Sequence, residues 1–226
     1  MSTAIAGVSS MATRVILGDL AQRYEAASGT PVAIRAMGGV DAAKLIRAGE
    51  ETDIVILASG PMGQLETEGH LLAGSVKPFA RSGMAIAVKA GAPRPDIGSE
   101  DAVRRAIAAA RKVGYSTGPS GDHLLQLCAR WGLDDPERML KAPPGIPVGA
   151  LVAQGDADLG FQQLSELLMP GIDVLGPLPT EIQAVTVFAA GVARTSRRAE
   201  ETRALIAYLT GPDADAVKRA HGMEPA

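Results

Sequence analysis

Small hydroxyl residues and glycines gather at residues 115–121, where the sequence reads Tyr-Ser-Thr-Gly-Pro-Ser-Gly. Residues 112–115, Lys-Val-Gly-Tyr, predict a short strand before this stretch, and the periodicity of residues 122–131 predicts a helix after it. The first N–H groups of a helix have no partner inside the helix, and the helix dipole is positive there, so such a turn suits an anion. The candidate ligand-binding residues of this turn are Ser116, Thr117, Ser120 and Gly121.

A second group of turn residues follows the first three predicted strands, at residues 3–8, 31–37 and 53–57. Serine favours helix N-caps and glycine fits plain turns, but serine also donates to anions and glycine lets the backbone approach a ligand closely. Together with the turn at residues 115–121, these turns predict one ligand held from two sides. The candidate residues of this group are Ser9, Ser10, Gly38, Gly39 and Ser59.

Arg81 and a pair of glutamines complete the candidate ligand contacts. Arg81 lies where the chain is expected to cross between two lobes, so it forms either an interdomain salt bridge or a bidentate clamp on a carboxylate. Gln162 and Gln163 directly follow the predicted strand at residues 157–161, and at least one amide is expected to face the ligand. Glu166, one helical turn further on, is expected to be exposed.

His123 is the candidate catalytic residue, because it lies in the first turn of the helix that follows the hydroxyl-rich turn. The alternative is an exposed or capping histidine. As a general base it would use an imidazole whose unperturbed pKa is near neutrality. The sequence contains no nucleophile elbow, phosphate loop or dinucleotide-binding glycine motif.

The composition excludes several functional classes. The 226 residues carry a net charge of −3 with no cluster of Lys or Arg, and only 3% are aromatic, which argues against nucleic-acid binding. Cys128, the one cysteine, has the apolar spacing of a buried helix residue, and the three histidines are widely separated. No metal site and no cofactor are therefore expected.

The first residues read as a strand and lack the basic region, long apolar run and cleavage site of a secretion signal. No stretch of about 20 apolar residues is present, so no membrane span is expected. The expected location is cytoplasmic if Met1 is native, and periplasmic if the sequence is a trimmed mature form.

The order of predicted elements indicates an α/β protein with a parallel sheet covered by helices. The simplest architecture has two lobes, one formed by residues 1–82 with 186–226 and the other by residues 83–185. The segments near residues 84–88 and 185–193 would cross between the lobes. Turns at the carboxyl ends of strands in both lobes would then face one ligand cleft.

The chain resembles the type II periplasmic-binding-protein fold, and within it the molybdate-binding branch. The resemblance covers nearly the whole chain. It rests on the order strand, Ser-Ser turn, helix, strand, Gly-Gly turn, helix, and on the motifs at residues 52–59, 131–133, 148–152 and 155–161.

The resemblance implies a set of binding residues, some of which depart from the family pattern. It implies a ligand contact for Ser9 or Ser10 and a backbone donor at Val148 or Gly149. Glycine at 38 or 39 replaces a family serine, and glutamine at 162 or 163 replaces a family tyrosine. Amides both donate and accept hydrogen bonds, so these departures favour a carboxylate or a hydroxy acid over molybdate itself.

Two functions of different classes follow. The first is a substrate-binding-protein-like protein that binds a small anion, an organic carboxylate or an oxyanion, in the cleft and delivers it to a transporter if it is exported. The alternative is a cytosolic isomerase of a small unsaturated polycarboxylate, because the aconitate isomerase type also looks like this branch. It would transfer a proton without a metal. A sensor or storage protein is a third use of the same site, and catalysis stays open.

Overall fold

The computed structural model describes residues 4–226, which fold as two compact units connected by two crossings of the chain. Unit 1 contains residues 1–81 and 187–226, and unit 2 contains residues 82–186. The boundaries expected from the sequence lie one residue away at each crossing. Thr3, where the first strand was expected to begin, lies outside the described residues.

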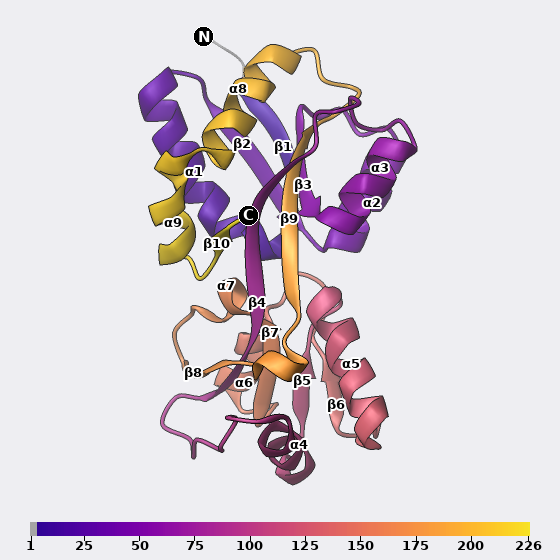
Figure 1. Cartoon of the computed structure of the whole chain (residues 1–226), viewed down its shortest axis with the longest axis vertical. Coiled ribbons are helices and arrows are strands. Elements are labelled where there is room, and N and C mark those ends of the chain that lie inside the picture. The colour runs from indigo at the N-terminus through magenta and orange to yellow at the C-terminus, as the bar shows by residue number, and fades with distance from the viewer. Residues whose placement is uncertain (1–3) are drawn as a thin grey trace. The chain divides into compact units, whose positions relative to one another are not determined.

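The elements follow each other in the order in which the sequence patterns placed them (Figure 1). The elements of unit 1 are β1 (Ile5–Ser10), the 3-10 turn η1 (Met11–Thr13), α1 (Arg14–Ser28), β2 (Val32–Met37), α2 (Gly39–Arg47), β3 (Ile54–Ala58), α3 (Ser59–Thr67), the start of β4 (Lys77–Lys89), the end of β9 (Val185–Val192), α8 (Ala199–Thr210), η3 (Pro212–Ala214), α9 (Asp215–Ala220) and β10 (Glu224–Pro225). The elements of unit 2 are the rest of β4, α4 (Glu100–Ala109), β5 (Val113–Tyr115), α5 (Pro119–Trp131), β6 (Met139–Lys141), α6 (Val148–Gln154), β7 (Leu159–Gln163), α7 (Leu164–Leu167), β8 (Ile172–Pro177), η2 (Thr180–Ile182) and the start of β9.

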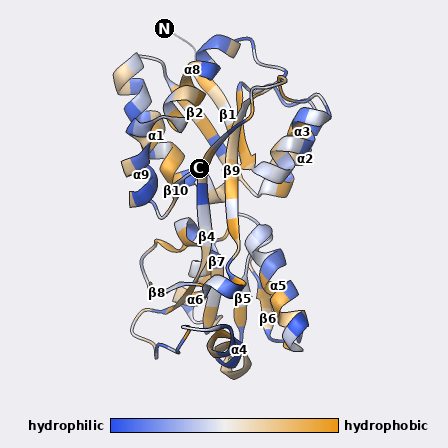
Figure 2. Cartoon of the chain, in the orientation of Figure 1, coloured by the Kyte–Doolittle hydropathy of each residue, from blue (hydrophilic) through white to orange (hydrophobic). Residues whose placement is uncertain are grey.

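The sheet of unit 1 has the order β2-β1-β3-β9, with β1 parallel to β2 and β3, and β9 antiparallel to β3. Strand β3 is buried on both faces: Ile54 and Ile56 pack toward α1 and α8, and Val55 and Leu57 pack toward α2 and α3. Hydrophobic residues are accordingly concentrated on these strands (Figure 2). A strand covered on both faces reads as a continuous apolar run, which is why this segment was recognisable in the sequence.

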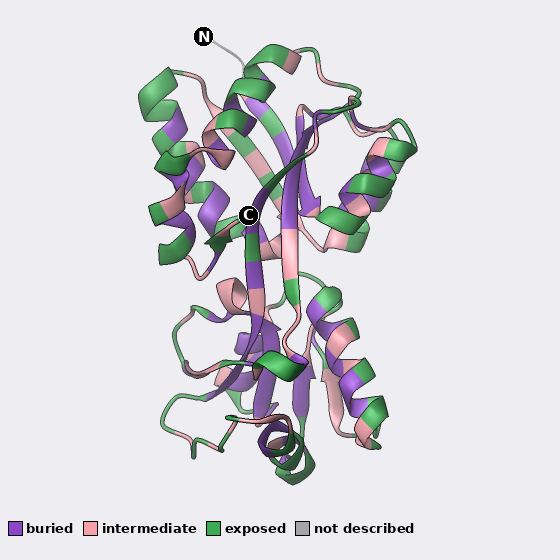
Figure 3. Cartoon of the chain, viewed as in Figure 1, coloured by how far each residue is buried: buried purple, intermediate pink, exposed green. Residues whose placement is uncertain are grey.

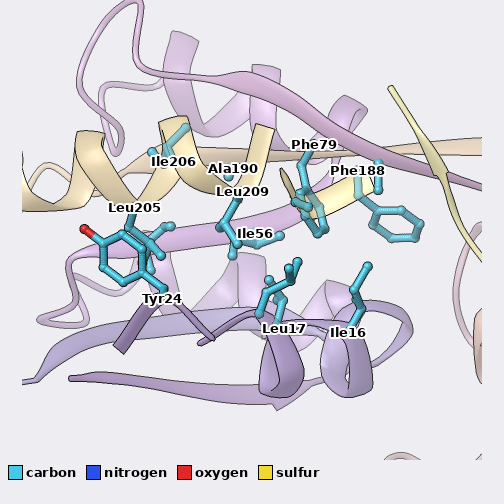
Figure 4. Close-up of a cluster of buried hydrophobic side chains, with 14 of the residues drawn as sticks. Ile16, Leu17, Tyr24, Ile56, Phe79, Phe188, Ala190, Leu205, Ile206 and Leu209 are labelled. Atoms are coloured by element: carbon cyan, nitrogen blue, oxygen red, sulfur yellow. The ribbon is translucent and has the colours of Figure 1, made fainter. Parts of the chain in front are cut away.

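The larger core of unit 1 joins the two ends of the chain. Leu17 and Tyr24 of α1 contact a cluster that includes Leu205 and Leu209 of α8 and Phe79 of β4 (Figure 4). Leu205 and Leu209 are 0% and 1% exposed. The N-terminal sheet therefore depends on C-terminal helices for the cover of one face.

Unit 2 repeats this plan with a smaller sheet, in the order β4-β7-β5-β6 and with β8 also paired to β4. Strands β5, β6 and β7 are parallel, and β4 is antiparallel to β7 and β8. Helices α4 and α5 cover one face, and α6 and α7 cover the other. The strands are mostly buried, and the outward faces of the helices are exposed (Figure 3).

Two helices begin earlier than the sequence predicted, because proline is tolerated in the first turn of a helix, where its missing N–H has no intrahelical partner to lose. Helix α5 begins at Pro119 instead of Asp122, and α3 begins at Ser59 and contains Pro61. Strands β6 and β10 were not predicted, because neither contains a β-branched or aromatic residue, whereas the equally short β5 contains Val113 and Tyr115. No helix among residues 4–226 is both long and apolar enough to cross a bilayer.

Helix α6 lies unusually close to its sheet, because the strands beneath it carry glycines. A Cβ on Gly160 would lie 2.6 Å from Cγ2 of Val152 and 3.0 Å from Cγ1 of Val148, and a Cβ on Gly114 would lie 2.9 Å from the same Val148 atom. A methyl group on either glycine would therefore push α6 away from the sheet. These two glycines therefore set the height at which the start of α6 stands over the sheet.

Gly160→Ala is expected to lower the free energy of unfolding by about 1–3 kcal/mol, because the added methyl group overpacks the contact with α6. Gly18→Ala is the matched control, since Gly18 is exposed within α1 and a Cβ there meets nothing within 4 Å. That control should stabilise the protein by roughly 0.5–1 kcal/mol through helix propensity. Chemical denaturation of both variants measures the difference, and equal effects would contradict the close packing.

Candidate functional site

The carboxyl ends of the parallel strands in unit 1 meet at one edge of the sheet, where α2 and α3 begin. The first helical hydrogen bond of α2 runs from Ala42 N–H to Gly38 O (2.8 Å), so the N–H groups of Gly39 and Val40 precede the helical ladder. Ser59 is exposed at the start of α3. Asp41 in the first turn of α2 adds a carboxylate, which reduces the attraction of this edge for an anion.

Ser9 and Ser10 are the last two residues of β1 and do not form the turn expected from the sequence. Ser10 lies beside α2, since its Cβ is 3.9 Å from the position of a Cβ on Gly39. Its hydroxyl lies 3.4 Å from Oγ1 of Thr13 and caps no helical N–H. Ser9 donates to the Ser10 carbonyl (3.4 Å) and lines a pocket of about 320 Å³ between α1 and β2. Of the two serines, Ser10 is therefore the one that lies next to Gly39 at the start of α2.

Arg81 is exposed at the unit 1 end of β4, opposite Glu224 of β10 in the antiparallel register. Within residues 4–226, its guanidinium has no ion-pair partner. The interdomain salt bridge and the ligand contact considered for Arg81 both stay predictions.

In unit 2, the parallel strands β5 and β7 bring the hydroxyl-rich turn beside the two glutamines. Tyr115 is paired with Phe161, so Ser116 and Gln162 follow at the same level on adjacent strands. The hydroxyls of Ser116 and Ser120 are 2.9 Å apart. One proton is used within this pair, which leaves the other O–H to donate to a ligand.

Ser120 does not cap helix α5, although serine is a favoured N-cap residue. The N-cap of α5 is Gly118, and Ser120 lies inside the first turn with 2% exposure. Thr117 is exposed. Gly121 is required by the turn, since a Cβ there would lie 1.8 Å from the Ser116 carbonyl oxygen.

The Gln162 amide bridges α6 and α7. Its Oε1 accepts the Val148 N–H (2.8 Å), and its Nε2 donates to Oε1 of Glu166 (2.7 Å). The Val148 N–H that the family resemblance assigned to a ligand is therefore occupied by Gln162. A ligand contact there requires Gln162 to move away.

Glu166 was expected to be exposed, but the structure places it half-buried in α7. Burial raises the pKa of the Glu166 carboxyl to about 7, although the hydrogen bond from Gln162 acts in the opposite direction. The sequence signal that could have identified it is the spacing of Gln162 and Glu166, four residues apart across the end of a buried strand.

Gln163 is 3% exposed and only half satisfied. Its Nε2 donates to Oγ1 of Thr186 (2.7 Å), whereas its Oε1 is buried and has no hydrogen-bond partner among the described residues. A buried acceptor without a donor is costly and is uncommon in native proteins. A donor from a bound molecule would satisfy it.

His123 has a role in positioning α5. Its Nε2 lies 2.8 Å from the carbonyl oxygen of Ile182, which fixes the ring against the segment before β9. With Nε2–H donating to this carbonyl, Nδ1 is the nitrogen left to accept a proton. The predicted catalytic role of His123 is not tested by this contact, but the contact gives a structural reason for the residue.

Cys128 is fully buried, as the helical spacing predicted. Burial, together with the nearby Asp134, raises the pKa of its thiol to about 11, so the thiol stays protonated and is a poor nucleophile. Across the described part of the chain, no group of three or more His, Cys, Asp or Glu side chains is placed to hold a metal ion.

Comparison with known proteins adds sequence and fold relatives. The family model for bacterial extracellular solute-binding proteins matches residues 5–224. An aconitate isomerase from a Pseudomonas species is 35% identical over 215 residues, which cover 92% of this chain and 82% of that protein.

Solved structures match along almost the full chain. The periplasmic molybdate-binding protein of Azotobacter vinelandii aligns with a TM-score of 0.82 and 21% identity, covering 97% of this chain and 98% of its own. A tungstate ABC transporter structure from Geobacter sulfurreducens aligns with a TM-score of 0.74 and 14% identity, covering 94% and 96%. At such identities the likeness shows fold, and it confirms the predicted two-lobed type II periplasmic-binding-protein fold.

Gly121→Ala is expected to lower the free energy of unfolding by at least about 3 kcal/mol, because the methyl group would collide with backbone that cannot yield cheaply. Gly63→Ala in α3 is the control, since a Cβ there meets nothing within 4 Å. Calorimetric melting of the two variants tests this. A Gly121→Ala protein as stable as the control would mean that the turn is not closed as described.

Glu166→Gln is expected to change the pH dependence of stability. Because the folded pKa of about 7 exceeds the ordinary value of 4.5, the unfolded chain loses this proton first, and stability is lost as pH rises from 4.5 to 7. Glu166→Gln has no carboxyl here and does not lose this stability as pH rises. The free energy of unfolding of the variant minus that of the wild type should therefore be larger above pH 7 than below pH 4.5, by on the order of 2–3 kcal/mol. Melting temperatures across this pH range measure the effect.

Glu137→Gln, which removes an exposed carboxyl of unit 2, controls for the loss of one negative charge. If both variants followed the wild type in parallel at every pH, the Glu166 carboxyl would not be buried as the structure has it.

Proposed function

The chain belongs to the family of bacterial extracellular solute-binding proteins, and from this premise we propose that it binds a small organic anion with at least one carboxylate. The observation that carries the proposal is the unit 2 edge formed by the Ser116–Ser120 hydroxyl pair and the two glutamines. Hydroxyl and amide donors bind a carboxylate without a cluster of basic residues.

Acceptor groups at the same edge argue for an organic acid over a metal oxyanion. The Oε1 of Gln163, which has no donor, and the ionised carboxyl of Glu166 would both accept hydrogen bonds from a ligand. A fully deprotonated oxyanion has no proton to offer them, whereas a hydroxyl or a protonated carboxyl does. Aconitate, the acid named for the 35% identical relative, is an unsaturated tricarboxylic acid and meets this requirement when one of its carboxyl groups is protonated.

Isomerisation of such an acid is the second candidate function. It is favoured by the aconitate isomerase relative, which matches 92% of the chain, and by the carboxyl of Glu166, whose pKa of about 7 suits proton transfer near neutral pH. Delivery of the acid to a membrane transporter is the role that a solute-binding protein without turnover would have, and a transporter is then the partner.

Isothermal titration calorimetry tests the binding proposal with cis-aconitate, trans-aconitate and citrate, and with molybdate and sulfate for comparison. At least one polycarboxylate is expected to bind with a stoichiometry near one, and more tightly than either oxyanion. Ser116→Ala/Ser120→Ala should weaken this binding by about 10–100-fold, the value of hydrogen bonds to a charged group.

Ser28→Ala is the control, because Ser28 ends α1 far along the chain from these turns and bonds to Tyr24 O. Tighter binding of molybdate or sulfate than of every organic acid would refute the carboxylate proposal. Equal affinities of the double variant and the control would remove the hydroxyl pair from the site.

A further inference from the structure

We propose that Glu166 is the general base of this protein and that it removes a proton from carbon next to the double bond of an unsaturated polycarboxylate, with Gln162 as its positioning residue. The inference rests on the proposed binding of an organic acid and extends the isomerase alternative. It gives Glu166 the role of general base that the sequence analysis considered for His123.

The Gln162 bridge fixes the Glu166 carboxyl in place. Because the Val148 N–H is a donor, it selects Oε1 of Gln162, and Nε2 is then left facing the carboxylate. Both ends of the amide are therefore held by groups whose own positions depend on secondary structure. Only Oε1 of Glu166 takes part in the bridge, which leaves Oε2 to accept a proton.

Among the described residues, burial and the hydrogen bond from Gln162 are the influences on the Glu166 carboxyl, and no cation acts on it. The elements packed against α7 are β7, α6 and β8. The sequences of β7 and α6 contain no ionisable residue, and β8 contains Asp173. Asp173 accepts the Gly91 N–H (3.1 Å) and lies 3.9 Å from Arg94, so its own partners are on the other side of β8.

This environment explains the elevated pKa of Glu166. A carboxylate paired with arginine stays ionised and is a weak base. A half-buried carboxylate with one amide donor takes up a proton more readily. A base whose pKa lies near the working pH combines a useful ionised fraction with proton affinity.

A second observation points to a ligand at the same strand ends. Gln163, next in the chain to Gln162, has a buried Oε1 without a donor, and the Ser116–Ser120 pair on the adjacent strand has a hydroxyl proton to give. A polycarboxylate in which one carboxylate accepts from a serine and a protonated carboxyl donates to Gln163 satisfies both.

The proton transfer balances without a cofactor. Oε2 of Glu166 takes a proton from the CH₂ carbon, and the electron pair of the broken C–H bond forms a new C=C bond to the adjacent carbon. The old double bond moves its electrons onto its far carbon, with charge spread into the attached carboxylate. Glu166 then returns the proton to that far carbon, so no atom is oxidised or reduced.

The test follows binding and proton exchange separately in the full-length protein. Wild type, Glu166→Gln, Gln162→Leu and the control Glu137→Gln are incubated with cis- or trans-aconitate in D₂O. NMR measures isomer conversion and deuterium uptake at carbon, and calorimetry measures affinity. Glu166→Gln keeps a side-chain oxygen that can accept the hydrogen bond from Gln162 Nε2, so the bridge and the fold are expected to be retained.

Wild type and Glu137→Gln should exchange and convert the acid, with kcat/KM falling as pH drops below about 7. Glu166→Gln should bind within a few-fold of wild type but lose about 10²–10⁴-fold in both rates. Gln162→Leu removes a donor that lowers the pKa of Glu166, so its acidic limb should move to higher pH, and a merely structural residue would not shift that limb.

Three results would overturn the inference while leaving acid binding intact: wild type that binds but neither exchanges nor converts the acid, Glu166→Gln with wild-type rates, or Glu166→Gln whose affinity falls as far as its rate. Failure of wild type to bind any polycarboxylate would refute the proposed function and this inference with it.

Discussion

The contact between α6 and its sheet is the constraint on which the candidate site of unit 2 depends. Gly114 and Gly160 leave no side chain beneath the helix, and Val148 and Val152 fill the space. This seating places the Val148 N–H against the end of β7, where it meets the Gln162 amide. The orientation of Gln162, and through it that of Glu166, thus follows from two missing methyl groups in the strands.

Both units offer hydrogen-bond donors at the ends of strands, but the donor groups differ between them. Unit 1 offers backbone N–H groups at Gly39 and Val40 and the hydroxyl of Ser10, with no amide side chain nearby in sequence. Unit 2 offers hydroxyls and amides and one carboxyl of elevated pKa. In unit 1 the carboxylate of Asp41 opposes these donors, whereas in unit 2 the buried acceptor of Gln163 lies beside them.

Much of the fold could be predicted from the sequence because its signals are local. The buried run at β3, the helical spacing of α1 and the positive-φ glycines that end helices, such as Gly29 and Gly132, each act within a few residues. Strand β6 could not be predicted, because Met139, Leu140 and Lys141 include no β-branched or aromatic residue and its pairing partner β5 lies far away in sequence.

The candidate site was predictable in its location and not in its internal connections. Strand ends identified Ser116 and Gln162, but sequence alone could not show that Val148 N–H is occupied or that Ser120 lies inside a helix. Glu166 was placed on the surface because a lone charged residue is ordinarily solvated. Its burial is a tertiary effect, produced by helices and strands that meet only after folding.

The chain order of the units has a consequence for biosynthesis. Unit 2 is one continuous segment inserted into unit 1, whose core needs Ala190 of β9 and Leu205 and Leu209 of α8. On the ribosome, the inserted unit is complete before the surrounding one can close, since residues 4–81 emerge without the helices that cover half of their sheet. The N-terminal strands must therefore wait, with apolar surface uncovered, until β9 and α8 are made. The length of this interval sets how long the uncovered strands can aggregate or bind chaperones.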